Sequence, residues 1–586
     1  MTAVTSAVAD RAAATRASAS RRRVVADGAV VILVALVLGA PALFTHDGFM
    51  RDFTNHLWLV WVQQTAISHH LLPTYFISAP QVGVFYPVYE FYGGTLYAAT
   101  GALAALLGGH VTVAYVATML LSVAAAYGGL LWLARQLGVR SWPAHAPAIV
   151  FVTSAYYVSN LYGRGAWPEC VATSAIPLLV ASGLRLARAP RTELVPASLF
   201  VVAAVVFLGS HNVTLLLGSL AMIAIGLLLC WALRISPRDL PARRLVVLGG
   251  LLALAAGVNA WFLVPNVVHA SDVQVSAQSL FGWKATGEFN APGVLFNPLR
   301  SVPSASTSPG LFVQIPDWFL LWVLAVGTAW GGVRRPLRRS GAAIAAVLLA
   351  LLALLMIAPL WDALPRTLRD VQFPYRLNTY VVLCVAGLVL FGVLAVQERS
   401  IGARRGRLAR PALAGAIAVS VGLCGWQLWA PRTEGMFSYR NRSAVFVSTH
   451  ITPHSWYDES YTDASAPIVY TGDRSLYIDP SAIGSDHVSL TVTPPPGTAP
   501  FTTNIAGGPY AVRVSGGIVP VGRSPGGTVV ARRRATVSGP VRITLSVAGG
   551  AIAAGKVVSA ISLLVLLGLL LFAVSRATRR RRTHRV

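Results

Sequence analysis

The sequence has 586 residues, of which 55% are hydrophobic and only 12% are charged. Soluble domains carry about a quarter charged residues, and a helix needs roughly 20 apolar residues to cross a membrane, so the composition excludes a soluble globular protein. The net charge of +26 indicates orientation by cationic cytoplasmic loops rather than nucleic-acid binding, because the arginines fall between apolar segments instead of forming one basic domain.

The chain begins with a basic segment that precedes its first apolar run. Arg21, Arg22 and Arg23 stand just before this run, and no small-residue cleavage site follows it. We therefore predict a cytoplasmic tail over residues 1–27 and an uncleaved first span. The apolar runs of the whole chain predict twelve transmembrane helices, at about 28–45, 111–134, 144–162, 170–187, 192–209, 212–234, 244–266, 317–333, 341–363, 377–397, 411–430 and 555–576.

One apolar run, at 93–110, decides the topology of everything after it. If this run does not cross the membrane, the arginine clusters between the spans lie on one face together with both termini, except for the arginines of the loop at 364–376. If it crosses, every cluster after the first changes sides, against the positive-inside rule. We therefore predict a transmembrane domain over 28–430 whose long first outer loop, 46–110, contains a partly embedded helix.

The first outer loop carries two residues that could act on a substrate. Asp52 and His56 are four residues apart, so a helix would place both on one face. A carboxylate shielded at the membrane surface suits a general base, but an aspartate here equally suits a helix cap. Further along, Tyr86 and Glu90 lie in an aromatic cluster that resembles an interfacial anchor, although an acid beside an apolar surface needs a partner.

Three other outer segments hold candidate site residues. Arg164 and Glu169 flank a turn between two spans, and they could bind an anion at a helix N-terminus or form a structural clamp. Arg376 and Gln372 lie in a short outer loop rich in arginine, where local aspartates or a bound phosphate would compensate the positive charge. His211 stands at an outer helix end, where a cap or a packing residue is the commoner role.

The last outer segment, 431–550, differs from the rest in composition. Runs of alternating apolar and polar residues at His487–Thr493, Tyr510–Val514, Thr528–Arg532 and Val541–Val547 are separated by Pro and Gly clusters. This pattern predicts a small β-sandwich outside the membrane. Residues 551–586 then form the final transmembrane helix and a basic cytoplasmic tail. The four cysteines show no metal-binding or disulfide spacing, and no carboxylate cluster indicates a metal.

Two motifs and the general layout resemble known families. The acidic residue in the first outer loop, the many spans and the C-terminal outer domain resemble the GT-C superfamily of integral membrane glycosyltransferases. Arg164-Gly165-Ala166-Trp167-Pro168-Glu169 and Val371-Gln372-Phe373-Pro374-Tyr375-Arg376 resemble the "RGAxPE" and "QFPWR" signatures of a bacterial membrane family labelled "6-pyruvoyl-tetrahydropterin synthase-related".

The resemblance implies a bacterial inner-membrane enzyme that transfers a sugar, with inversion, from a polyprenyl-phosphate donor to a glycan or glycolipid acceptor on the extracytoplasmic side. By analogy Asp52 matches the general base, assisted by His56 and Glu169. Arg376, Arg164 and Gln372 would hold the donor phosphate, whose leaving charge needs stabilisation. Glu90, Tyr86, His211 and Lys284 would contact substrate. The family commonly carries paired acids in the first loop, whereas here Asp47 and Asp52 are five residues apart.

Two further hypotheses remain open at this point. The chain could be an inactive scaffold of the same fold that assembles envelope glycan, with its β domain binding glycan or protein. It could also transport a lipid or polysaccharide, although its spans hold few ionisable residues near their centres, where ion-coupled transporters keep them.

Overall fold

The computed structural model describes most of the chain. The described residues are 22–45, 47–48, 52–75, 77–79, 84–86, 88–189, 193–235, 241–269, 335–369, 374–399, 404–429, 437–438, 487–503, 512–523, 529–547 and 549–583. The predicted span at 317–333 and the candidate residues Gln372 and Lys284 lie outside these ranges.

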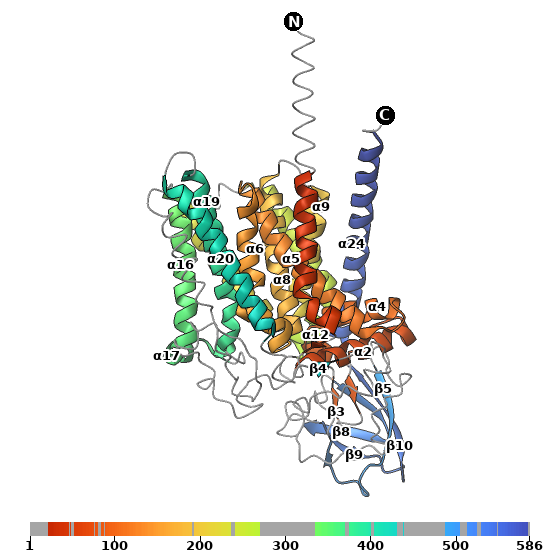
Figure 1. The fold of residues 1–586 in the computed structure, drawn as a ribbon. Coiled ribbons are helices and arrows are strands. Elements are labelled where there is room, and N and C mark those ends of the chain that lie inside the picture. Colours follow the sequence, from red (N-terminus) through yellow and green to blue (C-terminus); the bar gives the residue numbers. More distant parts are fainter. Residues whose placement is uncertain are drawn as a thin grey trace.

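A bundle of apolar helices forms the main body of the molecule (Figure 1). Its first described helix begins, and its last helix α24 ends, at the same end of the bundle, while the β strands lie at the opposite end. We call these the terminus end and the site end. The bundle helices are 22–38, α5 (Val111–Gln136), α6 (Ala146–Val152), α8 (Trp167–Arg188), α9 (Leu194–Ser210), α10 (Asn212–Leu233), α11 (Ala242–Val258), α16 (Arg335–Met356), α19 (Asn378–Arg399), α20 (Arg404–Trp429) and α24 (Gly550–Thr583).

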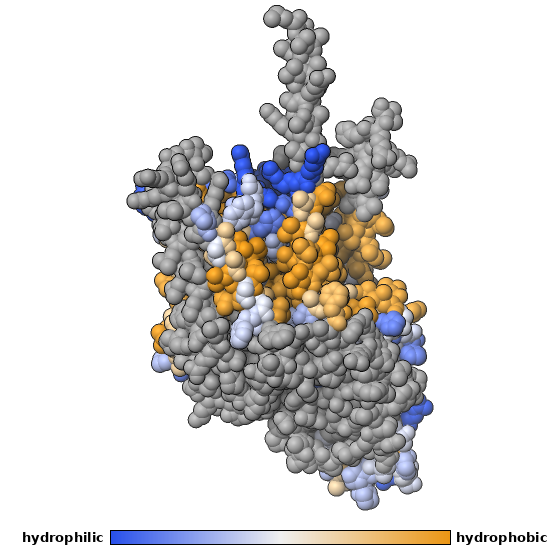
Figure 2. Space-filling model, viewed as in Figure 1, coloured by the Kyte–Doolittle hydropathy of each residue, from blue (hydrophilic) through white to orange (hydrophobic). Residues whose placement is uncertain are grey.

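Among the described residues, six helices are long and apolar enough to cross a membrane, or seven if one bent pair counts as a span. The shorter apolar helices include Leu194–Ser210 and Leu413–Trp426, which fall on two predicted spans. The number twelve therefore stays a prediction. The face of the bundle shown in the space-filling view is apolar in its middle, with hydrophilic residues at the terminus end (Figure 2). Such an apolar middle is the expected exterior of a membrane domain.

Three predicted spans are not single straight helices. The run at 144–162 begins with η2 (Trp142–His145) and breaks after α6 into α7 (Ala155–Val158) and the π-helix η3 (Ser159–Gly163). The run at 244–266 bends by 78° between α11 and α12 (Ala260–Val268). Residues 28–45 likewise end in a π-helix, η1 (Pro41–Thr45). Such interruptions are tolerated at membrane depth only where other groups satisfy the freed backbone atoms.

The first outer loop folds into helices that lie across the site end of the bundle (Figure 1). They are α2 (Asp52–His70), α3 (Val88–Phe91) and α4 (Gly94–Leu106), and a hairpin of β2 (Ile77–Ala79) and β3 (Val84–Tyr86) joins α2 to α3. With 13 residues, α4 is about 20 Å long and cannot cross the hydrocarbon layer. This agrees with the prediction that the run at 93–110 does not span.

The bend between α11 and α12 is held by the final helix, α24. The hydroxyl of Ser559 accepts a hydrogen bond from the backbone N–H of Trp261 at 2.7 Å and lies 3.0 Å and 2.9 Å from the carbonyl oxygens of Gly257 and Val258. At Gly555 the two backbones approach so closely that a Cβ atom would lie 2.6 Å from the carbonyl oxygen of Ala260. The last helix therefore fixes α12, which in turn contacts the outer-loop helices.

Two contacts extend this support to the outer loop. Tyr75, just after α2, donates a hydrogen bond to the carbonyl oxygen of Trp261 at 2.7 Å, and Lys556 of α24 lies over the Tyr75 ring. The indole N–H of Trp261 also donates to Thr95 of α4 at 3.0 Å. The chain's last helix thus helps to position its first outer loop.

The segment before α24 forms two three-stranded antiparallel sheets, with strand orders β5-β10-β7 and β6-β9-β8. Their strands are β5 (His487–Val492), β6 (Phe501–Thr502), β7 (Val512–Gly516), β8 (Ile518–Arg523), β9 (Val529–Arg533) and β10 (Val541–Val547). The four predicted strands are present within two residues of their expected bounds, and β6 and β8 were not predicted. The packing of the two sheets as a sandwich stays a prediction.

Three short elements complete the site end. α17 (Ala358–Asp362), α18 (Arg366–Arg369) and the 3-10 helix η7 (Pro374–Leu377) connect α16 to α19. A two-residue strand β1 (Asp47–Gly48) pairs with β4 (Phe437–Ser438), which joins the start of the first outer loop to the segment after α20. Asp47 therefore belongs to a strand and not to the helix that begins at Asp52.

Candidate active site

Four helices begin close to one another at the site end. Asp52 is the first residue of α2, Glu169 lies in the first turn of α8, His211 precedes α10, and Arg376 lies in η7 just before α19. The start of a helix presents free N–H groups and the positive end of its dipole. Their convergence favours negative charge at this place.

The charged side chains of these elements form a continuous chain of ion pairs. Nε of Arg164 lies 3.2 Å from a carboxylate oxygen of Asp52, and another nitrogen of the same guanidinium lies 3.3 Å from Glu169. Arg376 approaches the same oxygen of Glu169 at 3.8 Å. The predicted pair of Arg164 and Glu169 is confirmed, and Glu169 contacts both arginines.

Burial distinguishes the two carboxylates. The side chain of Glu169 is 3% exposed, whereas that of Asp52 is 27% exposed. Glu169 also accepts a hydrogen bond from the hydroxyl of Tyr156 at 2.7 Å. Asp52 is therefore the acid that an incoming molecule can reach.

The backbone of the Arg164–Glu169 turn explains how these side chains meet. The π-helix η3 ends at Gly163, and Gly165 adopts φ +72°, a conformation that favours glycine. A Cβ atom at Gly165 would lie 3.1 Å from the backbone nitrogen of Phe53. The turn thus abuts the start of α2, where the N–H of Asp52 donates to the carbonyl oxygen of Arg164 at 3.4 Å. π-helical turns of this kind are frequent at functional sites.

His211 and Arg376 lie side by side in the same region. Nδ1 of His211 lies 3.2 Å from the backbone nitrogen of Thr214 and 2.7 Å from its hydroxyl oxygen. Nε2 lies 3.4 Å from a guanidinium nitrogen of Arg376. Burial and the neighbouring Arg376 hold the pKa of His211 well below its usual value, so the ring is neutral. Arg376 can only donate, so its guanidinium supplies the N–H groups that an oxygen acceptor at this place would contact.

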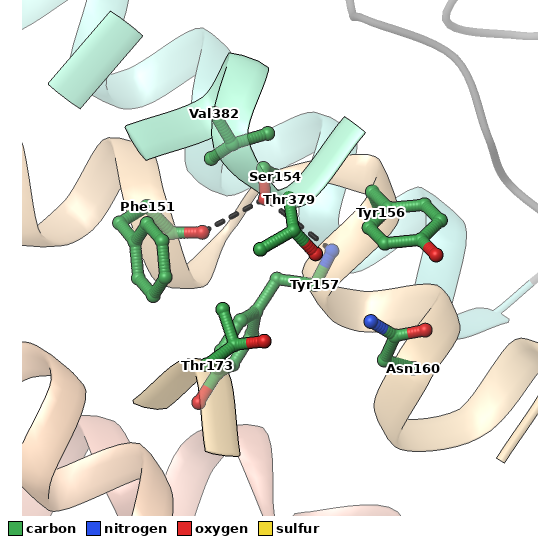
Figure 3. Close-up of a pocket in the computed structure, with 8 residues that line it drawn as sticks. All are labelled: Phe151, Ser154, Tyr156, Tyr157, Asn160, Thr173, Thr379 and Val382. Atoms are coloured by element: carbon green, nitrogen blue, oxygen red, sulfur yellow. Dashed lines mark hydrogen bonds between the residues drawn. The ribbon is translucent and has the colours of Figure 1, made fainter. Parts of the chain in front are cut away.

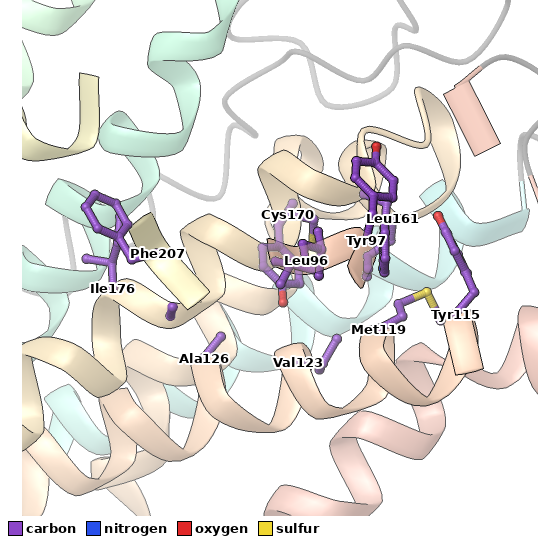
Figure 4. Packing of buried hydrophobic residues seen from close by; sticks show 14 of the residues in the cluster. Leu96, Tyr97, Tyr115, Met119, Val123, Ala126, Leu161, Cys170, Ile176 and Phe207 are labelled. Atoms are coloured by element: carbon purple, nitrogen blue, oxygen red, sulfur yellow. The ribbon is translucent and has the colours of Figure 1, made fainter. Parts of the chain in front are cut away.

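His56 is a buried, uncharged residue next to the charged residues of the site. It lies one turn after Asp52 on α2, as predicted, and its Nδ1 lies 2.7 Å from the hydroxyl of Tyr97. Burial lowers the pKa of His56 to about 4, against the opposing effect of Asp52. His56 and Tyr97 both pack near Trp167, which stacks on Tyr115. Figure 4 shows Tyr97 and Tyr115 among the buried residues of this region.

Tyr92 occupies the middle of the charged cluster and was missed by the sequence analysis. Its ring makes an edge contact with His211 at 5.7 Å and lies 6.2 Å from that of Tyr97. Its hydroxyl is within electrostatic reach of Arg376, Asp52, Arg164 and Glu169, and burial raises its pKa. The sequence around Tyr92 is rich in aromatic residues, so the pattern could not distinguish this tyrosine from an interfacial anchor. Its contacts in the site are made with elements that are distant in the chain.

A small cavity lies beside Tyr156 (Figure 3). It has a volume of about 10 Å³, enough for roughly one water molecule. The side-chain oxygen of Asn160 is buried at its wall and has no hydrogen-bond partner among the described residues. The cavity is lined by Phe151, Ser154, Tyr156, Tyr157, Asn160, Thr173, Thr379 and Val382. The cavity can hold a water molecule beside Tyr156 but is too small for a sugar.

Several predicted residues stand apart from the ion-pair chain or outside the described ranges. Glu90 is fully buried in α3 and pairs with Nδ1 of His269, at the end of α12. The described contacts give Glu90 a role in joining the outer loop to α12, and its contact with substrate stays a prediction. Tyr86 ends strand β3. Within the part of the chain that the structure describes, no group of three or more potential metal ligands is present.

Comparisons with known proteins find no match to a family model or to a curated protein. Among solved structures, the chain is similar to arabinofuranosyltransferase AftD from Mycobacteria, with a TM-score of 0.44 and 19% identity over 72% of this chain and 28% of that one. It is also similar to the archaeal oligosaccharyltransferase AglB from Archaeoglobus fulgidus, with a TM-score of 0.38 and 12% identity over 74% of this chain and 59% of that one.

The chain thus spans less than a third of the length of AftD and about three fifths of that of AglB. Both TM-scores lie below 0.5, so these likenesses carry no argument about function. The two motif resemblances stay predictions, and the function is argued below from the residues of the site.

Proposed function

We propose that this chain is a membrane glycosyltransferase that moves a sugar from a polyprenyl-phosphate donor to a cell-envelope glycan or glycolipid, with inversion. The observation that carries the proposal is the alternating chain Asp52–Arg164–Glu169–Arg376 at the site end of an apolar bundle. It combines a reachable carboxylate with a phosphate-binding guanidinium, which are the two groups this transfer requires.

Asp52 is the proposed general base. Its side chain is partly exposed, so an acceptor hydroxyl can approach it, whereas Glu169 is enclosed by Arg164, Arg376 and Tyr156. We assign to Glu169 the positioning of the two guanidinium groups. His56 is neutral and supports the start of α2 without accepting the proton itself.

Arg376 and His211 are the proposed contacts of the donor phosphate. A guanidinium can bind two phosphate oxygens at once, and the neutral ring of His211 lies beside it. The helix starts at α8, α10 and α19 reinforce the positive potential at this place. Arg164 connects this phosphate site to Asp52.

The transfer conserves the charge of the site, which is a further argument for it. A polyprenyl-phosphate sugar carries one negative charge as a phosphodiester, and the departing lipid phosphate carries nearly two. Asp52 loses one negative charge when it takes the proton of the acceptor hydroxyl. Arg164 is then released from its ion pair and can interact with the leaving group. The acceptor oxygen forms the new glycosidic bond as the bond from the anomeric carbon to the phosphate oxygen breaks.

The arginine clusters support a definite orientation. They gather at the terminus end, so the positive-inside rule places both termini in the cytoplasm and the site at the outer face of a bacterial plasma membrane. The β domain would then lie outside the membrane beside the acceptor. A lipid-linked donor would reach the site from within the bilayer.

The test uses the full chain in nanodiscs with a panel of radiolabelled polyprenyl-phosphate monosaccharides and an envelope glycan fraction as acceptor. We expect release of polyprenyl phosphate that requires both the acceptor and one particular sugar. Binding of undecaprenyl phosphate, compared with undecaprenol, separately measures phosphate recognition. If the protein bound undecaprenyl phosphate but transferred no sugar from any donor, the inactive scaffold would replace the enzyme. Failure to prefer the phosphate over the alcohol would remove the donor assignment.

A further inference from the structure

Two groups of arginines at the terminus end differ in their partners. Arg135 makes a two-point contact with Asp27, with both distances at 2.9 Å, and Arg185 pairs with Glu193. Arg188 and Arg244 donate to the backbone carbonyls of Gln136 and Ala187. These arginines are satisfied within the protein.

The second group consists of Arg234, Arg335, Arg338 and Arg339, which we call the α10–α16 arginine cluster. Arg234 follows the last residue of α10, and the other three lie in the first turns of α16. Arg339 is within electrostatic reach of the other three. No carboxylate or carbonyl oxygen among the described residues accepts from their guanidinium groups. Four like charges this close repel one another unless an external anion is present.

The surface beneath the cluster is apolar and outward-facing. Leu227, Trp231 and Arg234 are spaced by four and three residues, which places them on one face of α10. Trp231 is 77% exposed and Leu227 is 66% exposed. An exposed tryptophan below an arginine and above an exposed leucine is typical of the boundary between lipid headgroups and acyl chains.

We infer that the α10–α16 arginine cluster binds the headgroup of an anionic glycerophospholipid from the leaflet at the terminus end. The phosphodiester would contact the guanidinium groups, and an acyl chain would lie along Trp231 and Leu227. The apolar stripe favours a lipid over a free phosphate, which would use only the charges. This site lies at the opposite end of the bundle from the candidate active site and does not depend on the proposed function.

The test measures lipid retention by native mass spectrometry on the full chain taken from nanodiscs containing equal phosphatidylglycerol and phosphatidylcholine. We expect retention of phosphatidylglycerol to exceed that of phosphatidylcholine by at least about tenfold, because a tenfold preference needs about 1.4 kcal/mol and each basic residue near anionic lipid contributes roughly 1 kcal/mol. The triple variant R335Q/R338Q/R339Q should lose this preference, and W231A should weaken it by less than the triple variant does. The triple lysine variant R335K/R338K/R339K should retain most of it, which separates lost charge from misfolding.

The matched control is R22Q/R23Q/R140Q, which removes three exposed arginines from the same end of the molecule. It should keep the preference for phosphatidylglycerol. Equal loss in the control and the cluster variant would show diffuse attraction of positive charge and overturn the inferred site. Full retention in the cluster variant would also overturn it. Displacement of the lipid by inorganic phosphate alone would assign the cluster to a soluble anion instead.

Discussion

The two ends of the helical bundle use arginine in opposite ways. At the site end, Arg164 and Arg376 are largely buried and each contacts a carboxylate. At the terminus end, Arg234, Arg335 and Arg338 are exposed, and no described carboxylate contacts them. Burying a guanidinium costs free energy unless a carboxylate pairs with it, so the acids at the site end hold the two arginines in fixed positions. An exposed arginine cluster stays accessible to an anion from the membrane.

We expect the largest loss of sugar transfer from a substitution of Asp52, the reachable acid of the ion-pair chain. Asp52→Asn keeps the shape of the side chain but removes the proton acceptor, and we expect transfer to fall by about 1,000-fold. Binding of undecaprenyl phosphate should change little, because the phosphate contacts remain. Asp362→Asn, on an exposed aspartate at the end of α17, is the control. Full transfer by the Asp52 variant would remove the general base from the mechanism.

We expect the second largest loss of sugar transfer from a substitution of Arg376, whose planar guanidinium can contact several partners at once. Lysine keeps the charge but cannot contact Glu169, His211 and a phosphate at the same time. We expect Arg376→Lys to lower transfer by about 100-fold and to weaken binding of undecaprenyl phosphate. Arg369→Lys changes an exposed arginine on α18 in the same way and should leave both measurements unaltered. Equal behaviour of the two variants would show that Arg376 acts only as a general positive charge.

Gly555 and Gly568 of α24 differ in how closely other atoms surround them. At Gly555 an added methyl group would meet the carbonyl oxygen of Ala260, whereas at Gly568 it would meet no atom within 4 Å. Gly555→Ala should therefore destabilise the contact between α24 and the bent helix by about 3 kcal/mol and disturb the outer loop. Gly568→Ala should be neutral. Thermal unfolding and transfer rate of both variants measure this, and equal stabilities would contradict the bracing role of α24.

The smallest predicted effect is the pH dependence due to His56. Its pKa is about 4 in the folded chain and about 6.5 when unfolded. Between these values the unfolded chain binds a proton that the folded chain does not, so stability falls as the pH drops from about 6.5 towards 4. Between about pH 7 and pH 5 the loss should be about 2 kcal/mol. His56→Gln should flatten this dependence, while His69→Gln, on an exposed residue, should not.

Sequence patterns predicted those parts of the molecule whose signal is local. Apolar length indicated most of the long apolar helices that the structure describes, arginine position indicated that α4 does not cross, and apolar–polar alternation indicated four strands of the β domain. The pairing of Arg164 with Glu169 was also accessible, because five residues separate them in one turn. Asp52 and His56 were recognisable for the same reason.

Contacts between distant segments were not accessible in this way. Tyr92 meets His211 only because α3, α4 and α10 converge, and Glu90 pairs with His269 across 179 positions. The bend between α11 and α12 depends on Ser559, about 300 residues later in the chain. No local pattern encodes such partners, so sequence reasoning did not find the partner of Glu90 and overlooked Tyr92.

The position of a bound lipid phosphate tests the account most directly, because it decides between the two ends of the molecule. A density map of the full chain in nanodiscs with undecaprenyl phosphate would locate the phosphorus atom. We predict that it lies within contact of Arg376 and His211, with Asp52 open beside it. Phosphate density confined to the α10–α16 arginine cluster, with none near Arg376, would contradict the proposed active site.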